Sequence, residues 1–89
     1  MTTRFHRHSD LRLTALAGEG VVLHIKERRY FTVNETGLTI LEALLMPKTF
    51  EELVQAILDR YDVTPEEAER TTREFLDRCT DAGLLDRGA

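Results

Sequence analysis

Three histidines are the side chains in this sequence most able to bind a metal ion. His6 and His8 lie near the N-terminus, and His24 follows later in an apolar stretch. A transition-metal site needs three or four converging ligands that are held in place by further contacts. Two of these histidines belong to a polar segment without periodicity, and the third is expected on the polar face of a strand. We therefore interpret all three as surface residues and predict no metal site and no cofactor.

Cys79 is the only cysteine, and a cysteine thiol could act as a nucleophile. A single cysteine allows no intramolecular disulfide, which is typical of proteins in a reducing cytoplasm. It lies between Leu76 and Ala82 on the apolar stripe of a predicted helix. A reactive thiolate needs an electropositive, partly open environment. We expect a buried and unreactive thiol.

Carboxylates crowd the same predicted helix and could form a catalytic pair. They alternate with arginines at spacings of three and four residues, which favours a solvated face with weak ion pairs. One flank differs because it borders the apolar stripe, where a ligand could reach it. That flank consists of Glu69, Arg73, Leu76, Asp77 and Thr80. No Gly-rich phosphate loop, Ser/His/Asp set or His-Glu-x-x-His pattern is present, and we predict a protein that is not an enzyme.

Length and charge restrict the partners. The 89 residues suffice for one domain with a thin core, which leaves little room for a deep active site. The net charge of −4 argues against a nucleic-acid partner, because such proteins carry a basic face. No signal peptide and no apolar run of about 20 residues is present, so we expect a cytoplasmic protein without a membrane partner.

The first half of the chain alternates with period two. Residues 1–10 show no pattern and are interpreted as a flexible N-terminal arm. Three runs at 11–15, 21–25 and 30–33 are expected to form an antiparallel meander, because the links between them are short. Its core face is predicted to carry Leu13, Leu23, Ile25, Phe31 and Val33.

The second half has the period of helices. Asn34 is a good N-cap, and two capping boxes begin at Thr49 and Thr64. Gly83 is expected to stop the last helix, with Leu84 packing back. The fold class is therefore α+β: a three-stranded antiparallel sheet followed by three helices, winged-helix-like, in one domain over residues 11–86.

The third strand is the most informative element for function. In a meander it is an edge, so its outer N–H and C=O groups need a partner or a cover. The strand has Arg29 at its start but neither a proline nor an inward charge. Either the last helix or the N-terminal arm covers this edge, or a peptide adds to it as a further strand.

Several short motifs, in this order and spacing, resemble the PqqD-like family over about residues 11 to 86. They are Gly20-Val21-Val22-Leu23, the run from Arg29 to Gly37, Thr49-Phe50-Glu51-Glu52-Leu53, Tyr61-Asp62-Val63, Phe75-Leu76 and Gly83-Leu84-Leu85. The stretch His24 to Arg28 differs from the Pro-Glu-Gly-like stretch usual in members that make pyrroloquinoline quinone. The chain looks more like the leader-binding subunit of a lasso-peptide system.

The resemblance implies a domain that binds the leader of a ribosomally made, post-translationally modified peptide and delivers it to a separate leader peptidase or other modifying enzyme. The leader would lie along the third strand, beside the third helix. Carried over by position, the peptide-binding residues are Arg29, Tyr30, Phe31, Thr32, Val33, Glu69, Arg73, Leu76, Asp77 and Thr80. The alternatives are a winged-helix nucleic-acid-binding protein and a scaffold subunit of a larger biosynthetic complex.

Overall fold

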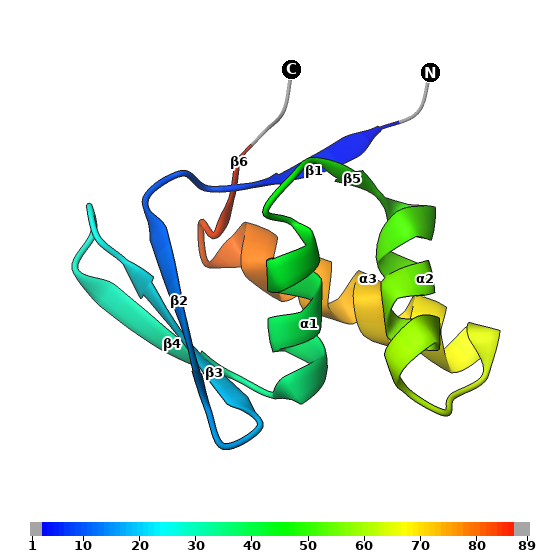
Figure 1. Cartoon of the computed structure of the whole chain (residues 1–89). Coiled ribbons are helices and arrows are strands. Elements are labelled where there is room, and N and C mark those ends of the chain that lie inside the picture. The colour runs from blue at the N-terminus through cyan, green and yellow to red at the C-terminus, as the bar shows by residue number, and fades with distance from the viewer. Residues whose placement is uncertain (1–2, 87–89) are drawn as a thin grey trace.

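The computed structural model describes residues 3–86, which form two antiparallel sheets and three helices (Figure 1). A meander contains β2 (Leu11–Leu16), β3 (Glu19–His24) and β4 (Arg29–Val33), with β3 in the middle. The helices are α1 (Glu35–Ala43), α2 (Phe50–Arg60) and α3 (Pro65–Asp81). The predicted α+β fold, with a three-stranded antiparallel sheet followed by three helices, is confirmed.

Tight turns leave β2 and β4 at the two edges of the meander. Ala17 and Gly18 form the whole link between β2 and β3, and both have positive φ, +49° and +85°. This is the geometry of a type I′ turn, whose twist matches that of the strands. The link from β3 to β4 is longer and ends at Arg28, which also has a positive φ of +56°.

The predicted core face of β3 is wrong by one residue. Val22 is fully buried and pairs with Leu13 on one side and Phe31 on the other, whereas Leu23 and Ile25 are exposed. Val21, Val22 and Leu23 are all apolar, so the sequence pattern did not show which of these side chains face the core. Pairing with both neighbours decides which residues point to the helices.

Glycine at position 20 is part of the same packing. It lies on the buried face of β3, where a Cβ atom would stand 2.8 Å from Leu38 Cδ1 and 2.9 Å from Val33 Cγ2. Only a residue without a side chain allows α1 to approach the sheet this closely.

The helices begin where the capping patterns predict. Asn34 Oδ1 accepts from Gly37 N at 2.8 Å before α1. Thr49 and Glu52 exchange both hydrogen bonds of a capping box before α2. Thr64 caps α3, with Pro65 at the first helical position.

The C-terminus of α3 is closed by a Schellman motif. Gly83 has a φ of +74° and donates to Thr80 O, while Leu84 N donates to Cys79 O at 2.9 Å. The turn sends Leu84 back into the core, where it is 3% exposed. The predicted helix stop at Gly83 is therefore confirmed.

The N-terminal segment is not a free arm. Residues Arg4–Arg7 form β1, which lies between β5 (Lys48–Thr49) and β6 (Leu85–Asp86) in a second sheet. His8 N then donates to Leu84 O at 2.9 Å. The sequence could not show this, because both partner strands are two residues long and carry no pattern of their own. Residues 1 and 2 of the predicted arm lie outside the described part of the chain.

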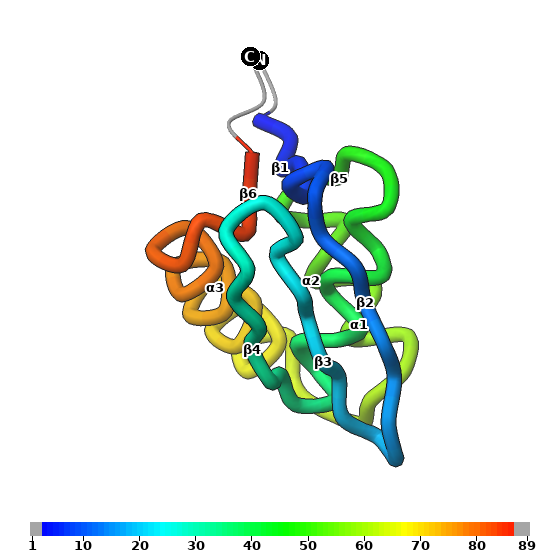
Figure 2. Tube along the Cα trace, turned by 90° about the vertical axis from the view of Figure 1, so that its left-hand side faces the viewer, coloured from blue at the N-terminus to red at the C-terminus, as the bar shows by residue number. Residues whose placement is uncertain are grey.

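Figure 2 shows how the two layers meet. The helices lie behind the meander, with α3 beside β4 at one margin and β2 at the other. The core between the layers is aliphatic and includes Val22, Ile40, Leu41, Leu53, Ile57 and Leu76. This arrangement leaves the two sheet edges on opposite sides of the domain.

Candidate functional site

The hydrogen-bond register of the meander determines which backbone groups remain free. Ile25 N donates to Asp10 O at 3.0 Å, in line with the register of β2 and β3. Hydrogen-bonded pairs alternate with non-bonded pairs along an antiparallel ladder. Leu23, two residues before Ile25, therefore also points its backbone groups to β2. Val22 points its backbone groups the other way, to β4.

The same alternation continues across β4. Val22 pairs with Phe31, so the N–H and C=O of Phe31, and of Val33 two residues on, are used inside the sheet. The N–H and C=O of Tyr30 and Thr32 point outward. No strand among residues 3–86 pairs with this outer edge. Four backbone groups are thus available to a guest strand.

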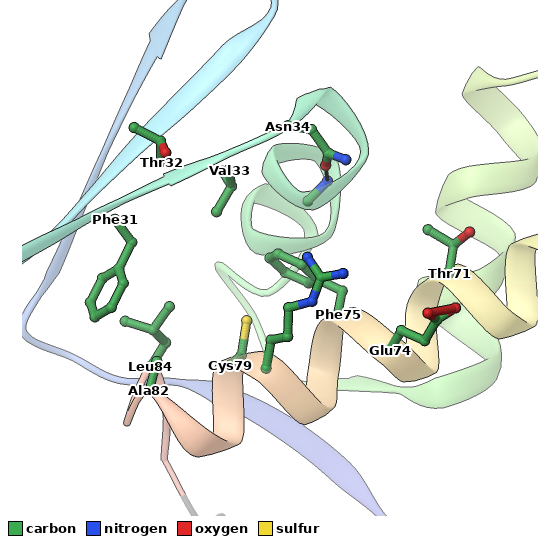
Figure 3. A pocket seen from close by; sticks show the side chains of 12 residues that line it. Phe31, Thr32, Val33, Asn34, Thr71, Glu74, Phe75, Cys79, Ala82 and Leu84 are labelled. Atoms are coloured by element: carbon green, nitrogen blue, oxygen red, sulfur yellow. Dashed lines mark hydrogen bonds between the residues drawn. The ribbon is translucent and has the colours of Figure 1, made fainter.

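A groove of about 470 Å³ lies directly beside this edge, between β4 and α3 (Figure 3). Its volume is in the range of sites that hold a few side chains of a ligand. The strand contributes Phe31, Thr32 and Val33, followed by Asn34. The helix contributes Thr71, Glu74, Phe75, Arg78, Cys79 and Ala82, and Leu84 closes one end. Free backbone groups on one wall and apolar side chains below are what an extended peptide requires.

Phe75 owes its position to a glycine in α1. A Cβ atom on Gly37 would meet the Phe75 ring at 2.6 Å, so the ring fills the space that any other residue would occupy. The side chain of Asn34 holds this first turn in place through its bond to Gly37 N. The groove wall on α3 is therefore tied to the end of β4 through α1.

Charge is concentrated at the helix side of the groove. Glu74 pairs loosely with Arg70 at 3.9 Å, and both are exposed. Arg78 forms no ion pair within the part of the chain that the structure describes, so it can meet a carboxylate of a ligand. The groove thus has one paired anion and one free cation at its rim.

Cys79 lies in the lining of the groove, and its thiol is buried. Its side chain is 1% exposed, as the sequence predicted. Burial raises the pKa of the thiol to about 12, and the nearby Arg78 guanidinium opposes this only in part. The thiol is therefore uncharged at neutral pH and acts as a small apolar side chain.

The strand half of the predicted site lies at this groove. Phe31, Thr32 and Val33 line it, and Tyr30 is 73% exposed at the free edge. Arg29 does not line the groove. Its guanidinium lies over the Phe31 ring, 5.2 Å from the centroid.

The predicted binding residues of α3 do not line the groove beside β4, so their predicted position next to the strand is wrong. Arg73, Leu76, Asp77 and Thr80 line a second hollow of about 270 Å³ together with Phe5 and Phe50. Glu69, on the same flank by helical spacing, is exposed. Leu76 is 4% exposed and part of the core.

Both flanks of α3 border one buried stripe, which explains this error. The sequence showed the stripe, but it could not show which flank faces β4. The flank that faces the strand is the one with Thr71, Glu74 and Arg78. The sequence analysis had placed Glu74 and Arg78 among the charges of the solvated face, although Arg78 is a single turn from the apolar Phe75 and Ala82.

His24 is buried, at 3% exposure, and not on a polar strand face as predicted. Its ring packs against His8 with the centroids 4.5 Å apart. Nδ1 of His8 accepts from Asp10 N at 3.1 Å, and Nδ1 of His24 accepts from Glu27 N at 3.4 Å. Over residues 3–86, no three His, Cys, Asp or Glu side chains gather as metal ligands.

This combination defines a class: a small α+β domain with a free strand edge above a groove that a helix closes. Residues 19–85 match the family described as coenzyme PQQ synthesis protein D (PqqD), and the chain belongs to this family. The resemblance seen in the sequence is thereby confirmed. No sequence among curated proteins matches the chain.

Two solved structures share the fold. "TbiB1 in Complex with the TbiA(beta) Leader Peptide" has a TM-score of 0.80 and 30% identity over 94% of this chain and 98% of that chain. "Lasso peptide synthetase B1 complexed with the leader peptide" has a TM-score of 0.74 and 19% identity over 92% of this chain and 96% of that one. Both are complexes of a protein with a leader peptide.

None of the helices within residues 3–86 is long and apolar enough to cross a bilayer.

Proposed function

We propose that this protein binds the leader segment of a ribosomally synthesised, post-translationally modified peptide, of the lasso-peptide type, as a fourth strand of the meander. The observation that carries the proposal is the free edge of β4, with the backbone groups of Tyr30 and Thr32 directed outward beside the groove. The leader complexes formed by the two structural relatives support it. Binding would take place in the cytoplasm, where ribosomes make the precursor.

Backbone pairing alone is too weak for a useful complex. Four edge hydrogen bonds contribute about 2–6 kcal/mol in total, at about 0.5–1.5 kcal/mol each. Micromolar affinity requires about 8 kcal/mol. Apolar leader side chains must therefore be buried in the groove, against Phe31, Phe75 and Leu84. Backbone pairing then sets direction and register, and the groove sets which leader binds.

The role that we propose is not catalytic. The one thiol in the groove, that of Cys79, is buried and uncharged at neutral pH, which is the opposite of an activated nucleophile. The bound leader would instead be delivered to a separate leader peptidase. Omitting this protein from a cleavage assay with that peptidase and its precursor should slow leader removal, and equal rates with and without it would exclude delivery.

Calorimetry with the TbiA(beta) leader as the probe tests the binding site. Thr32→Pro removes an outward N–H without touching the ladder to β3, and should weaken binding at least about tenfold. Ala15→Pro is the matched control, because the same register directs its N–H to the outer edge of β2. Equal affinity of Thr32→Pro and the unmodified protein would exclude strand addition at β4.

A second pair of variants tests which flank of α3 faces the leader. Arg78→Glu changes the charge at the groove, and Arg73→Glu makes the same change on the opposite flank. We expect weaker binding of an acidic leader only for Arg78→Glu. If Arg73→Glu alone weakens binding, the leader lies in the hollow beside Phe5 and Phe50.

A further inference from the structure

The other edge of the meander, at β2, also borders a groove. It has a volume of about 430 Å³ and is lined by Arg7, Leu11, Arg12, Leu13, Glu42 and Leu45. No strand among residues 3–86 pairs with the outer edge of β2. Since β2 and β4 are separated by β3, a guest at either edge leaves the other edge free.

The register again shows which groups are available. The backbone of Asp10 points to β3, because its C=O accepts from Ile25 N. Arg12 and Thr14 therefore also bond to β3, and the backbone groups of Leu13 and Ala15 point outward. Edge strands in stable proteins are usually guarded by proline, lysine or a bulge. Among the described residues, the side chain that protects the edge of β2 is that of Arg12. Its Nη1 donates a hydrogen bond to Leu11 O at a long distance of 3.3 Å.

The lining of this groove includes a large exposed aliphatic side chain. Leu45, which follows α1, is 74% exposed, and the next residue in the chain, Met46, is 65% exposed. Neither lies near the groove at β4, which is lined by β4 and α3. Large aliphatic side chains with this exposure beside a free strand edge are typical of a surface that another chain covers.

The charges indicate what kind of chain that is. Arg7 and Arg12 form no ion pair within residues 3–86, and Arg7 Nη1 donates instead to Leu41 O at 3.0 Å. The one carboxylate in the lining, Glu42, is engaged by Arg60 at 3.9 Å. The groove is thus locally basic, although the protein carries a net charge of −4.

We infer that the edge of β2 is a second strand-addition site, which binds an extended acidic segment of another protein independently of the edge of β4. In that segment, apolar side chains would alternate with carboxylates, because side chains alternate across a strand. The apolar ones would lie on the face of Leu13 and contact Leu45. The carboxylates would lie on the face of Arg12. The site would let the domain hold two extended chains on opposite sides of one sheet.

Amide shifts of the full-length ¹⁵N-labelled protein test the inference. The probe is acetyl-Glu-Leu-Glu-Val-Glu-Leu-amide, and the control peptide has lysine at each glutamate position. We expect the acidic peptide to shift the amides of Leu13 and Ala15 and to leave those of Tyr30 and Thr32 unchanged. Binding should weaken as salt is raised, because the ion pairs are exposed.

Variants separate this site from that of the leader. Arg12→Glu should weaken the acidic probe about five- to tenfold, and Arg73→Glu, far from β2, should not. Thr32→Pro should leave binding of the acidic probe unchanged and weaken binding of the leader. A negative result for the site at β2 can therefore be distinguished from a negative result for the site at β4. Ala15→Pro should weaken the probe about tenfold.

Three kinds of result would overturn the inference. The first is a failure of the acidic probe to bind specifically, seen as an absence of shifts at Leu13 and Ala15 or as equal binding of the lysine peptide. The second is that the acidic probe shifts Tyr30 and Thr32. The third is a concentration-dependent dimer in sedimentation that Ala15→Pro dissociates, which would make a second copy of this chain the occupant of the edge.

Discussion

The ring of Phe75 occupies the place where a side chain on Gly37 would begin, with Cε1 only 2.6 Å from the position of a Cβ atom. Gly37 is buried in the first turn of α1, and Phe75 lines the groove from α3. The contact determines how closely the two helices approach and how wide the groove is beside β4.

Gly37→Ala should therefore destabilise the domain, although alanine is the better helix former. The gain in helix propensity is about 1 kcal/mol, whereas overpacking costs about 1–3 kcal/mol. We expect a net loss of about 1 kcal/mol in urea unfolding and weaker leader binding, because the half-buried ring would be displaced into the groove. Thr36→Ala, one position earlier, is the control. If Gly37→Ala is more stable than the unmodified protein and binds the leader with unchanged affinity, the contact between Gly37 and Phe75 does not limit the packing of the two helices.

Thr72 offers a route to higher stability. Its Oγ1 is buried in the core side of α3 without a hydrogen-bond partner. A buried polar group without a partner costs about 1–3 kcal/mol, and valine keeps the shape without the hydroxyl. Thr72→Val should raise the free energy of unfolding by about 1 kcal/mol, as measured in urea. Thr71→Val, at a half-buried position, should gain less, and a destabilised Thr72→Val would reveal an unseen partner of the hydroxyl.

The thiol of Cys79 should make stability depend on alkaline pH. Burial raises its pKa to about 12, while an unfolded cysteine ionises near pH 8.5. Between these values the unfolded chain loses a proton that the folded one keeps, so stability is full below about pH 8.5 and falls as pH rises towards 12. Comparing the unfolding of Cys79→Ala with that of the unmodified protein from pH 8 to 10 measures this. The alanine variant should lack that part of the decline.

The reactivity of the same thiol gives an independent check. Alkylation by iodoacetamide at pH 8 should be slow in the folded protein and rapid in urea, because the thiolate is the reactive form. Rapid labelling without denaturant would contradict the burial of Cys79.

The capping box of α2 should control acid stability. The pKa of the Glu52 carboxyl lies below its usual range, first because it accepts from the Thr49 backbone N–H and also through the Thr49 side chain and Arg4. A lowered pKa contributes stability above the ordinary value of about 4.3, and that stability is lost as pH falls through the lower folded value. Glu52→Gln should therefore reduce the loss of stability below about pH 4.5.

Glu51→Gln, which removes the adjacent charge but leaves the capping box intact, is the control for this experiment. Acid unfolding curves that coincide for Glu52→Gln and the unmodified protein would show that the bond to Thr49 N does not hold in solution.

Much of the fold could be predicted from the sequence because its signals are local. The caps at Asn34, Thr49 and Thr64 and the stop at Gly83 act within four or five residues, and each is where it was expected. The edge position of β4 also followed from short links alone. A pattern that depends on neighbouring residues can be interpreted without knowing what packs against it.

What the sequence could not determine depends on contacts between distant segments. Three features arise from partners far along the chain. They are the choice of which β3 side chains point to the core, the pairing of β1 with β5 and β6, and the burial of His24. The same holds for the site. The sequence determined an edge strand and a striped helix, but only the packing of α3 on α1, through Phe75 and Gly37, decided that Arg78 and not Arg73 faces that strand. A helix with two similar flanks can turn either one to a sheet edge, and the tertiary contacts select between them.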